Sequence, residues 1–305
     1  MSHSILQLRS VTKYYATHKA VDGISFDVPA QSIFGMLGPN GAGKTTTIRM
    51  ITNILIPDSG EIVFDNASLT ANSRELMGYM PEERGLYKKM KVFEQLLYLA
   101  QLKGMEKVAA KKSINEWLDK LRIADWANKN VQDLSKGMQQ KIQFISTVAH
   151  NPRLIILDEP FSGLDPLNSE LIKNEIYELR QKGTTVIFST HRMEQVEEIC
   201  EEIILINKGK LLLQGTVKDI RKQYKENKYH LAFEGNSPSL PPGIQYTTNA
   251  DDASSLTIVL PNDYNSNELL QHIITQGVHI TAFREILPSL NEIFIRSVEQ
   301  SDLTA

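Results

Sequence analysis

The sequence predicts an α/β fold followed by a small α+β domain. Short apolar runs alternate with helical periods over residues 1–225, which is typical of a mostly parallel sheet covered by helices. Apolar residues repeat with a helical period at 92–121, which predicts an all-helical insert at about 88–150. The composition then changes, and residues 234–243 are rich in Pro, Ser, Gly and Asn. We therefore predict two domains, 1–225 and 226–305.

The elements of the first domain follow from its apolar runs. Two strand-like runs lie at 5–11 and 23–28, and a third at 33–37 leads into a glycine-rich turn. A helix is expected to begin near Gly43. After the insert we expect strands at 154–157, 185–189 and 203–206 and helices at 167–181 and 193–200.

The second domain alternates strands and helices on a smaller scale. Strands are expected at 229–233, 256–259 and 278–283, with a helix at 266–276. The last helix begins with Ser289-Leu-Asn-Glu292, the spacing of a capping box.

Composition excludes several classes of protein. The chain has 305 residues and a formal net charge of -3, so it lacks the basic character of a dedicated nucleic-acid binder, and no nucleic-acid partner is expected. Its single cysteine, Cys200, cannot form an intrachain disulfide, which fits a reducing compartment. Residues 1–9 lack an apolar signal core and the longest apolar runs are strand-sized, so we expect a chain that neither spans a bilayer nor is secreted.

The glycine-rich turn carries the first chemical motif. It satisfies the phosphate-loop pattern G-x-x-x-x-G-K-[ST] with Gly38, Pro39, Asn40, Gly41, Ala42, Gly43, Lys44, Thr45 and Thr46. Glycines let backbone N–H groups and the following helix N-terminus approach phosphate closely. Lys44 is expected to bridge the β- and γ-phosphates, and the Thr45 hydroxyl to ligate Mg²⁺.

Two adjacent carboxylates end the apolar run at 154–157. Asp158 is expected at the carboxyl edge of the sheet, where it can hold Mg²⁺ through the water shell of the ion. Glu159 is the candidate general base for the attacking water. Alone, such a pair would more often cap a helix or be solvated; together with the phosphate loop, the catalytic interpretation is favoured.

Between these motifs, the run Leu134-Ser135-Lys136-Gly137-Met138 resembles the LSGGQ signature of ATP-binding-cassette (ABC) ATPases, with Lys136 and Met138 as departures. Ser135 and the N–H of Gly137 stand before a predicted helix whose dipole suits a γ-phosphate. In isolation this could be only a helix cap. The resemblance implies two ATP molecules sandwiched between two nucleotide domains, from a homodimer or from pairing with a paralogous ATPase subunit.

Further matches occur in the family's order. Tyr15 resembles the aromatic residue that stacks on adenine, with Tyr14 as the alternative. Asp165, in Ser162-Gly-Leu-Asp165, resembles part of the loop that couples the two sites. His191 resembles the switch histidine that contacts the γ-phosphate.

One family loop departs from the usual pattern, because Glu82 stands where a glutamine is usual. Its carboxylate can ligate Mg²⁺ but adds negative charge near the γ-phosphate. The stretch Pro81-Glu-Glu-Arg-Gly-Leu-Tyr87, together with Pro288-Ser-Leu-Asn-Glu-Ile-Phe294, is similar to bacterial exporter subunits of sodium-extrusion and drug-resistance systems. That similarity implies a peripheral subunit at the cytoplasmic face of the cell membrane that drives a separate transmembrane permease.

Two alternatives remain at this point. A soluble mechanical ABC ATPase acting on a nucleic-acid or ribosomal partner usually has long coiled coils or two cassettes, and neither is present. The second alternative is a different phosphate-loop enzyme: a GTPase typically reads guanine with Asn-Lys-x-Asp, and no such run occurs, whereas a small-molecule kinase would have no evident use for the motif at 134–140. The cargo and the role of 226–305 are open.

Overall fold

The structure is a computed structural model that describes residues 3–70, 72–83, 85–249 and 252–303. The chain divides into two compact units. Met1–Val217, with Ser301–Ala305, forms one, here called the N-terminal unit; Lys218–Gln300 forms the C-terminal unit. The predicted domain boundary near residue 225 lies within the C-terminal unit and stays a prediction.

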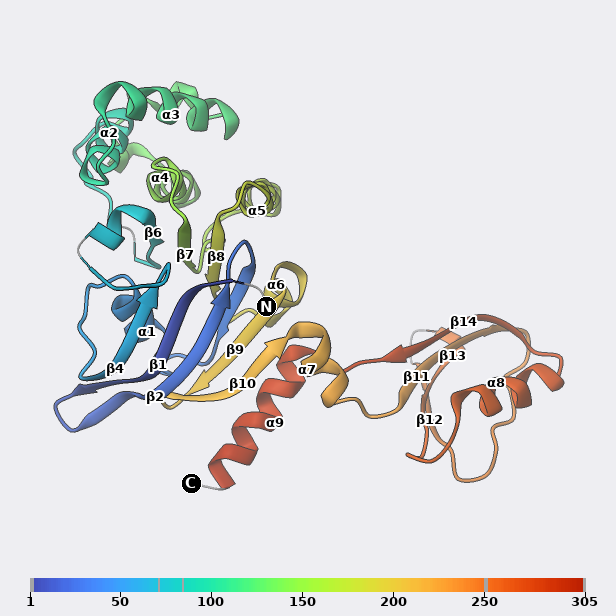
Figure 1. Cartoon of the computed structure of the whole chain (residues 1–305). Helices are drawn as coiled ribbons and strands as arrows, with labels where there is room; N and C mark the ends of the chain where they lie inside the picture. The colour runs from blue at the N-terminus through green and yellow to red at the C-terminus, as the bar shows by residue number, and fades with distance from the viewer. Residues whose placement is uncertain (1–2, 71, 84, 250–251, 304–305) are drawn as a thin grey trace. The chain divides into compact units, whose positions relative to one another are not determined.

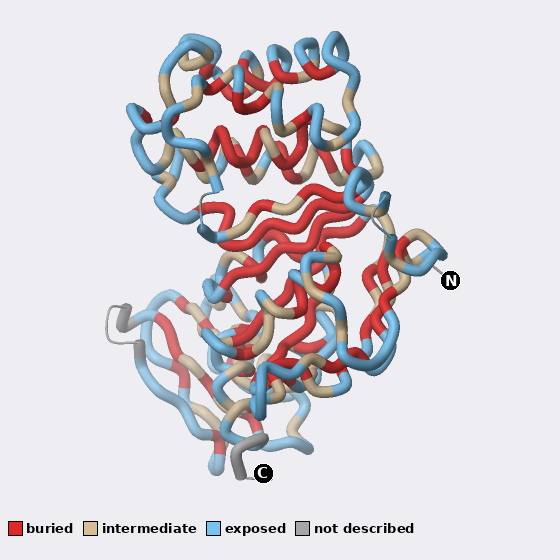
Figure 2. Tube along the Cα trace, turned by 90° about the vertical axis from the view of Figure 1, so that its left-hand side faces the viewer, coloured by how far each residue is buried: buried red, intermediate tan, exposed pale blue. Residues whose placement is uncertain are grey.

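A six-stranded sheet forms the centre of the N-terminal unit (Figure 1). Its order is β10 (Lys210–Thr216), β9 (Glu202–Asn207), β3 (Ile33–Leu37), β8 (Thr185–Ser189), β7 (Leu154–Asp158) and β6 (Met77–Met80). All neighbours are parallel except β9 and β10. Every residue of β3, β7 and β8 is buried, as expected for continuous apolar runs covered on both faces (Figure 2).

The first two predicted strands belong to a second sheet. Its order is β2 (His18–Pro29), β1 (Ser4–Tyr15), β4 (Ser59–Phe64) and β5 (Ala67–Ser68), all antiparallel. Apolar side chains of this sheet pack with Ile48, Met50 and Ile51 of α1 (Lys44–Ile51) and with β3 in one core. Alternating burial along β1 and β2 fits a sheet with only one face on that core.

Helices follow the phosphate loop and the insert. The helical period at 92–121 corresponds to α2 (Val92–Leu102) and α3 (Lys107–Lys120), and α4 (Lys136–Val148) follows two short 3₁₀ turns, Ala124–Trp126 and Val131–Asp133. Another 3₁₀ turn, Asn72–Leu76, precedes β6. Trp117 and Phe144 pack edge to face at 5.9 Å and join α3 to α4. The helices α5 (Pro166–Gln181) and α6 (Met193–Ile199) complete the strand–helix alternation.

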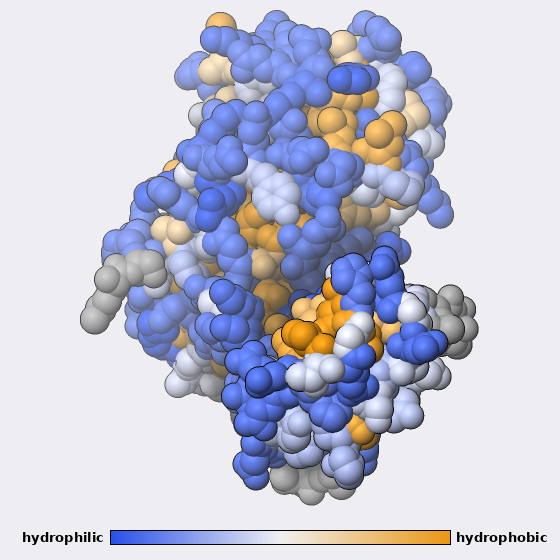
Figure 3. Space-filling model, turned by 90° about the vertical axis from the view of Figure 1, so that its right-hand side faces the viewer, coloured by the Kyte–Doolittle hydropathy of each residue, from blue (hydrophilic) through white to orange (hydrophobic). Residues whose placement is uncertain are grey.

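The C-terminal unit is an antiparallel sheet with one helix on it. The order is β12 (Gln245–Asn249), β13 (Asp252–Val259), β11 (Lys228–Glu234) and β14 (His279–Ile286). Leu269 and Ile273 of α8 (Ser266–Thr275) pack in one core with apolar residues of β11 and β13. Figure 3 shows hydrophobic side chains gathered on the face of this unit turned to the viewer.

Two helices flank this sheet in the sequence, α7 (Val217–Gln223) and α9 (Leu290–Leu303). The predicted capping box is present at the start of α9. The N–H of Ser289 donates to Glu292 Oε2 at 2.7 Å, and the N–H of Glu292 donates to Ser289 Oγ at 3.2 Å.

Candidate active site

The phosphate loop connects the end of β3 to the start of α1, as predicted. A Cβ at Gly38 would overlap the carbonyl oxygen of Ile206, and one at Gly43 would come 2.5 Å from the Ala20 carbonyl oxygen. Gly43 also has φ 106°, which favours glycine. No side chain caps α1, so the N–H groups of its first turn are available to an anion.

Lys44 lies across this loop. Its Nζ donates to the carbonyl oxygens of Gly38 at 2.8 Å and Pro39 at 3.1 Å. Burial lowers the pKa of the ammonium group, while the nearby carboxylates of Asp158 and Glu159 oppose that shift. The charged lysine is therefore held inside the loop beside acidic groups.

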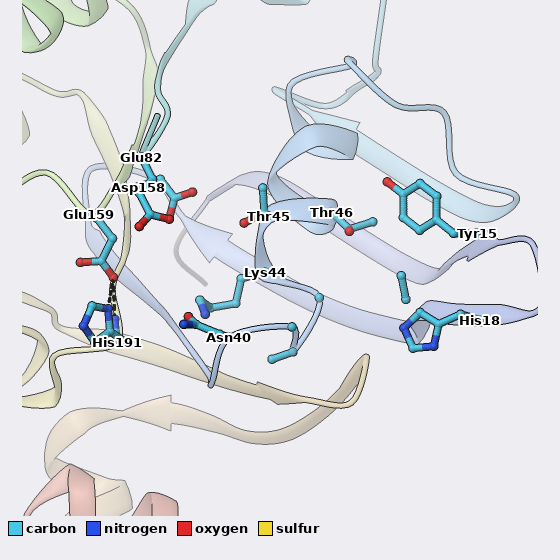
Figure 4. Close-up of a pocket in the computed structure, with 14 residues that line it drawn as sticks. Tyr15, His18, Asn40, Lys44, Thr45, Thr46, Glu82, Asp158, Glu159 and His191 are labelled. Atoms are coloured by element: carbon cyan, nitrogen blue, oxygen red, sulfur yellow. Dashed lines mark hydrogen bonds and ion pairs between the residues drawn. The ribbon is translucent and has the colours of Figure 1, made fainter. Parts of the chain in front are cut away.

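Asp158 and Glu82 lie near each other at the carboxyl end of β7 (Figure 4). Burial raises the pKa of Asp158, and the negative charges of Glu82 and Glu159 raise it further, whereas Lys44 opposes the rise. A divalent cation would relieve this repulsion. Among the described residues no group of three or more His, Cys, Asp or Glu side chains forms a metal site, so further oxygens would have to come from phosphate and water.

Glu159 is held by donors on both carboxylate oxygens. The Thr190 hydroxyl donates to Oε2 at 3.0 Å, and the His191 N–H donates to Oε1 at 2.8 Å. His191 Nδ1 lies 2.7 Å from the same Oε1 (Figure 4). The Glu159 side chain is 11% exposed, whereas that of His191 is 60% exposed, so the carboxylate is buried and the imidazole is open to solvent.

One pocket of about 470 Å³ brings most of the predicted residues together. Its lining includes Tyr15, Asn40, Gly41, Ala42, Gly43, Lys44, Thr45, Thr46, Glu82, Asp158, Glu159 and His191. Tyr15, and not Tyr14, belongs to this lining. Figure 4 shows Tyr15 at the end of the pocket far from Glu159 and His191.

Sequence reasoning missed His18, which also lines the pocket. It pairs with Tyr15 across the β1–β2 hairpin, and Figure 4 shows the two side chains at the same end. A lone histidine in a polar stretch gives no signal by itself. Its pairing with a predicted adenine-stacking residue across a hairpin was the one available indication.

Ser135, Gly137 and Asp165 do not line this pocket. The Ser135 side chain caps α4 by accepting the N–H of Met138 at 3.3 Å, and Asp165 caps α5 by accepting the N–H of Asn168 at 2.9 Å. Gly137 packs closely on the loop 162–165 that precedes α5, because a Cβ at Gly137 would lie 3.0 Å from the Gly163 carbonyl oxygen. The three residues therefore gather in a region of their own.

These features fit a nucleoside triphosphate. The glycine cradle and uncapped helix N-terminus suit phosphate, the lysine supplies positive charge, and the Tyr15 ring offers a flat surface for a base. Thr45, Glu82 and Asp158 present hydroxyl and carboxylate oxygens, the ligand type that Mg²⁺ prefers.

Within the described part of the chain, none of the helices combines the length and apolar character needed to cross a membrane.

Comparison with known proteins agrees with this site. A family profile described as ABC transporter matches residues 21–162, and one described as ATP-binding protein DrrA1-3-like, C-terminal domain, matches 215–298. The uncharacterized ABC transporter ATP-binding protein YhaQ of Bacillus subtilis (strain 168) is 44% identical over 96% of this chain and 98% of its own. The linearmycin resistance ATP-binding protein LnrL of the same organism is 29% identical over 95% of this chain and 97% of its own.

A solved structure described as an ATP binding subunit of an ABC transporter shares its fold with most of this chain. It superposes with a TM-score of 0.69 at 28% identity, over 72% of this chain and 93% of its own. The predicted family and fold are confirmed, and a soluble mechanical ATPase is not favoured. The chain belongs to the ABC transporter family, as an ATP-binding, ATP-hydrolysing subunit of an ATP-driven transporter.

Proposed function

We propose that the pocket binds Mg–ATP and that Glu159 is the general base of hydrolysis. Lys44 and the N–H groups of the phosphate loop hold the phosphates, and Tyr15 stacks on the base. Thr45, Asp158 and Glu82 supply oxygens to Mg²⁺, which neutralises phosphate charge. Glu159 accepts a proton from the attacking water. His191 lies beside Oε1 of Glu159 in this structure, and when ATP is bound it contacts the γ-phosphate.

The hydrolytic unit is proposed to be a dimer. The observation that supports it is the separation of the site residues: Ser135, Gly137 and Asp165 do not line the pocket of their own chain. A second copy, or a paralogous ATPase subunit, that closes on the pocket would bring its own Ser135 and Gly137 to the γ-phosphate. The α4 N-terminus, capped by Ser135, would then add its dipole to that contact.

The partner is proposed to be a transmembrane permease that binds the N-terminal unit on the cytoplasmic side of the cell membrane. Tyr87 at the end of the 81–87 loop and Tyr98 of α2 are both exposed. Tyr87 and Tyr98 contact each other edge to face at 6.0 Å. A second pocket, about 400 Å³, is lined by Glu82, Glu83 and Gly85 of this loop together with Thr45 and Asp158. This loop can therefore transmit changes at the metal site to the surface. Arg84 of the loop lies outside the described residues.

The direction of transport is proposed to be export. The similarity to LnrL, named for linearmycin resistance, supports this proposal. Selection of the cargo is assigned to the permease.

The decisive experiment is an affinity purification of the Glu159→Gln chain from detergent-solubilised native membranes in Mg–ATP. Removing the base should trap the closed dimer with its partner. We expect a multi-span membrane protein to copurify with Glu159→Gln and not with the Lys44→Ala, Glu159→Gln double variant. Recovery of ribosomal or DNA-associated proteins instead would contradict the transporter role.

A further inference from the structure

The helix α4 carries a buried glutamine that contacts the peptide beside Glu159. Gln140 is 2% exposed, and its Nε2 donates to the carbonyl oxygens of Glu159 at 3.3 Å and Pro160 at 3.0 Å. Its Oε1 is buried without a hydrogen-bond partner. Because two carbonyl acceptors face the amide, the N–H₂ group must point toward them. An uncompensated buried oxygen is unfavourable, so the fold keeps Gln140 here at a cost in stability.

The backbone that Gln140 contacts has an unusual conformation. Glu159 has φ 51°, in the left-handed region that a non-glycine residue rarely adopts. Its N–H donates to the Ser189 carbonyl oxygen at 2.8 Å, so one side of the residue is fixed by β8. The carbonyl oxygen on the other side is fixed by Gln140. Such a conformation persists only where surrounding contacts determine it, and it clusters at functional sites.

The Glu159 side chain and its backbone are held by different groups. Thr190 and His191 hold the carboxylate, whereas Ser189 and Gln140 hold the peptide. If His191 turns to a γ-phosphate, one side-chain contact is lost while both backbone contacts remain. The carboxylate is then free to accept a proton from water without a shift of its Cα.

We infer that Gln140 is a positioning residue for hydrolysis, which keeps Glu159 in place through the carbonyl groups of residues 159 and 160. The inference rests on the proposed role of Glu159 as general base. It also gives α4 a second role. The same helix is capped by Ser135, which is proposed to contact the ATP bound by the opposing copy. Closure of the dimer at Ser135 therefore acts, through one rigid helix, on the Glu159 of the same chain.

Gln140→Met tests this inference because methionine has a similar size and no N–H donor. We expect the single-turnover rate at saturating Mg–ATP to fall about 10- to 100-fold, the range that a small misplacement of a reacting group produces. The dissociation constant of ATP should stay within about twofold, because Gln140 does not line the pocket.

The matched control is Thr147→Val on the same helix. Thr147 is also buried, at 3% exposed, its hydroxyl donates to the Gln143 carbonyl oxygen at 2.9 Å, and it does not line the pocket. A loss of thermal stability with unchanged turnover is expected. If Gln140→Met and Thr147→Val lower turnover equally, or neither does, the inference is overturned.

Gln140→Glu gives a second measurement even if Gln140→Met does not fold. A carboxylate facing two carbonyl oxygens repels them, whereas the protonated acid can donate to one. The turnover of Gln140→Glu relative to the unmodified chain should therefore rise as the pH falls from 8 to 6. A ratio that does not change with pH would count against the inference. Glu159→Gln belongs in the same assay: if that variant retains turnover, the proposed base is wrong, whereas failure of the Gln140 variants alone overturns only the positioning role.

Discussion

Each unit contains a glutamate whose carboxylate lies beside the Nδ1 atom of a histidine. In the N-terminal unit, Glu159 Oε1 lies 2.7 Å from His191, and in the C-terminal unit Glu234 Oε2 lies 2.9 Å from His279. The two pairs have the same chemistry. Their surroundings differ, because the Glu159 side chain is 11% exposed and that of Glu234 is 70% exposed.

The same contrast holds for charged groups more generally. The N-terminal unit buries Lys141, Asp158, Glu159 and Glu175, whereas no charged residue is buried among the described residues of the C-terminal unit. Burying a charge is costly unless it is paired, so a fold keeps such groups where they have a use. Burial of the glutamate and the left-handed backbone at Glu159 therefore distinguish the candidate active-site pair from a surface ion pair with nearly the same distance.

The largest expected difference is in hydrolysis. Glu159→Gln should lower the turnover of ATP about 1000-fold, within the range of a lost general base, and leave ATP binding intact. The matched change Glu234→Gln should have no effect on turnover, because that pair is in water and its loss is worth little. For each variant, the rate of phosphate release measures turnover, and an equilibrium titration measures ATP binding. Equal rates for the two variants would remove the distinction between the pairs.

How much of this site the sequence predicts depends on how local the signal is. Residues 40–46 of the phosphate loop, Asp158, Glu159 and His191 line one pocket, because strand ends and short motifs fix where they lie. Their chemical roles stay predictions. Gln140 was not predicted, because the partner of a buried amide is decided by packing between α4 and β7 and by no motif.

The fold shows the same division. Strands with continuous apolar runs, such as β3, β7 and β8, were predicted at their observed positions. Strands β4, β5, β6, β10 and β12 were not predicted, because they are short or polar, or contain glycine. The sequence also did not indicate that β1 and β2 form a sheet separate from the parallel one. Strand pairing is a long-range property that hydrophobic period alone does not contain.

A stability change confined to the C-terminal unit is the next largest effect expected. Leu269→Ala removes a fully buried side chain of α8 and should lower the free energy of unfolding of this unit by about 3 kcal/mol. Ile274→Ala on the same helix, 61% exposed, should change it by less than about 0.5 kcal/mol. Urea unfolding followed by limited proteolysis measures both, with ATP binding measured in parallel. Loss of ATP binding together with the C-terminal unit would show that the two units do not unfold separately.

The half-buried His150 is expected to make stability depend on pH, and the exposed His279 provides the comparison. Burial lowers the pKa of His150 to about 4, helped by Lys103, while its Nε2 lies 3.1 Å from the Met77 carbonyl oxygen. Because the folded pKa lies below the ordinary 6.5, this histidine contributes stability that is present above pH 6.5 and lost as the pH falls toward 4.

Between pH 8 and pH 5 this group should account for about 2 kcal/mol of lost stability. His150→Gln keeps a donor for Met77 and does not titrate. Between pH 8 and pH 5, the unfolding free energy of this variant should therefore fall by about 2 kcal/mol less than that of the unmodified chain. Urea unfolding at both pH values measures the difference, and His279→Gln is the exposed control. If both variants lose as much stability as the unmodified chain, protonation of His150 does not limit stability.

The smallest effect is expected at Glu82, the carboxylate that replaces a glutamine. Asp158 beside it is buried, whereas Glu82 is exposed, so water screens most of the interaction between Glu82 and a cation. Glu82→Gln should therefore raise the Mg²⁺ concentration for half-maximal hydrolysis only about threefold, and Glu83→Gln, next to it in the chain, should raise it less. The difference should disappear at high salt, where exposed charges are screened. If Glu82→Gln leaves the Mg²⁺ requirement unchanged at low salt, its oxygens take no part in holding the ion, and the metal site consists of Thr45 and Asp158 alone on the protein side.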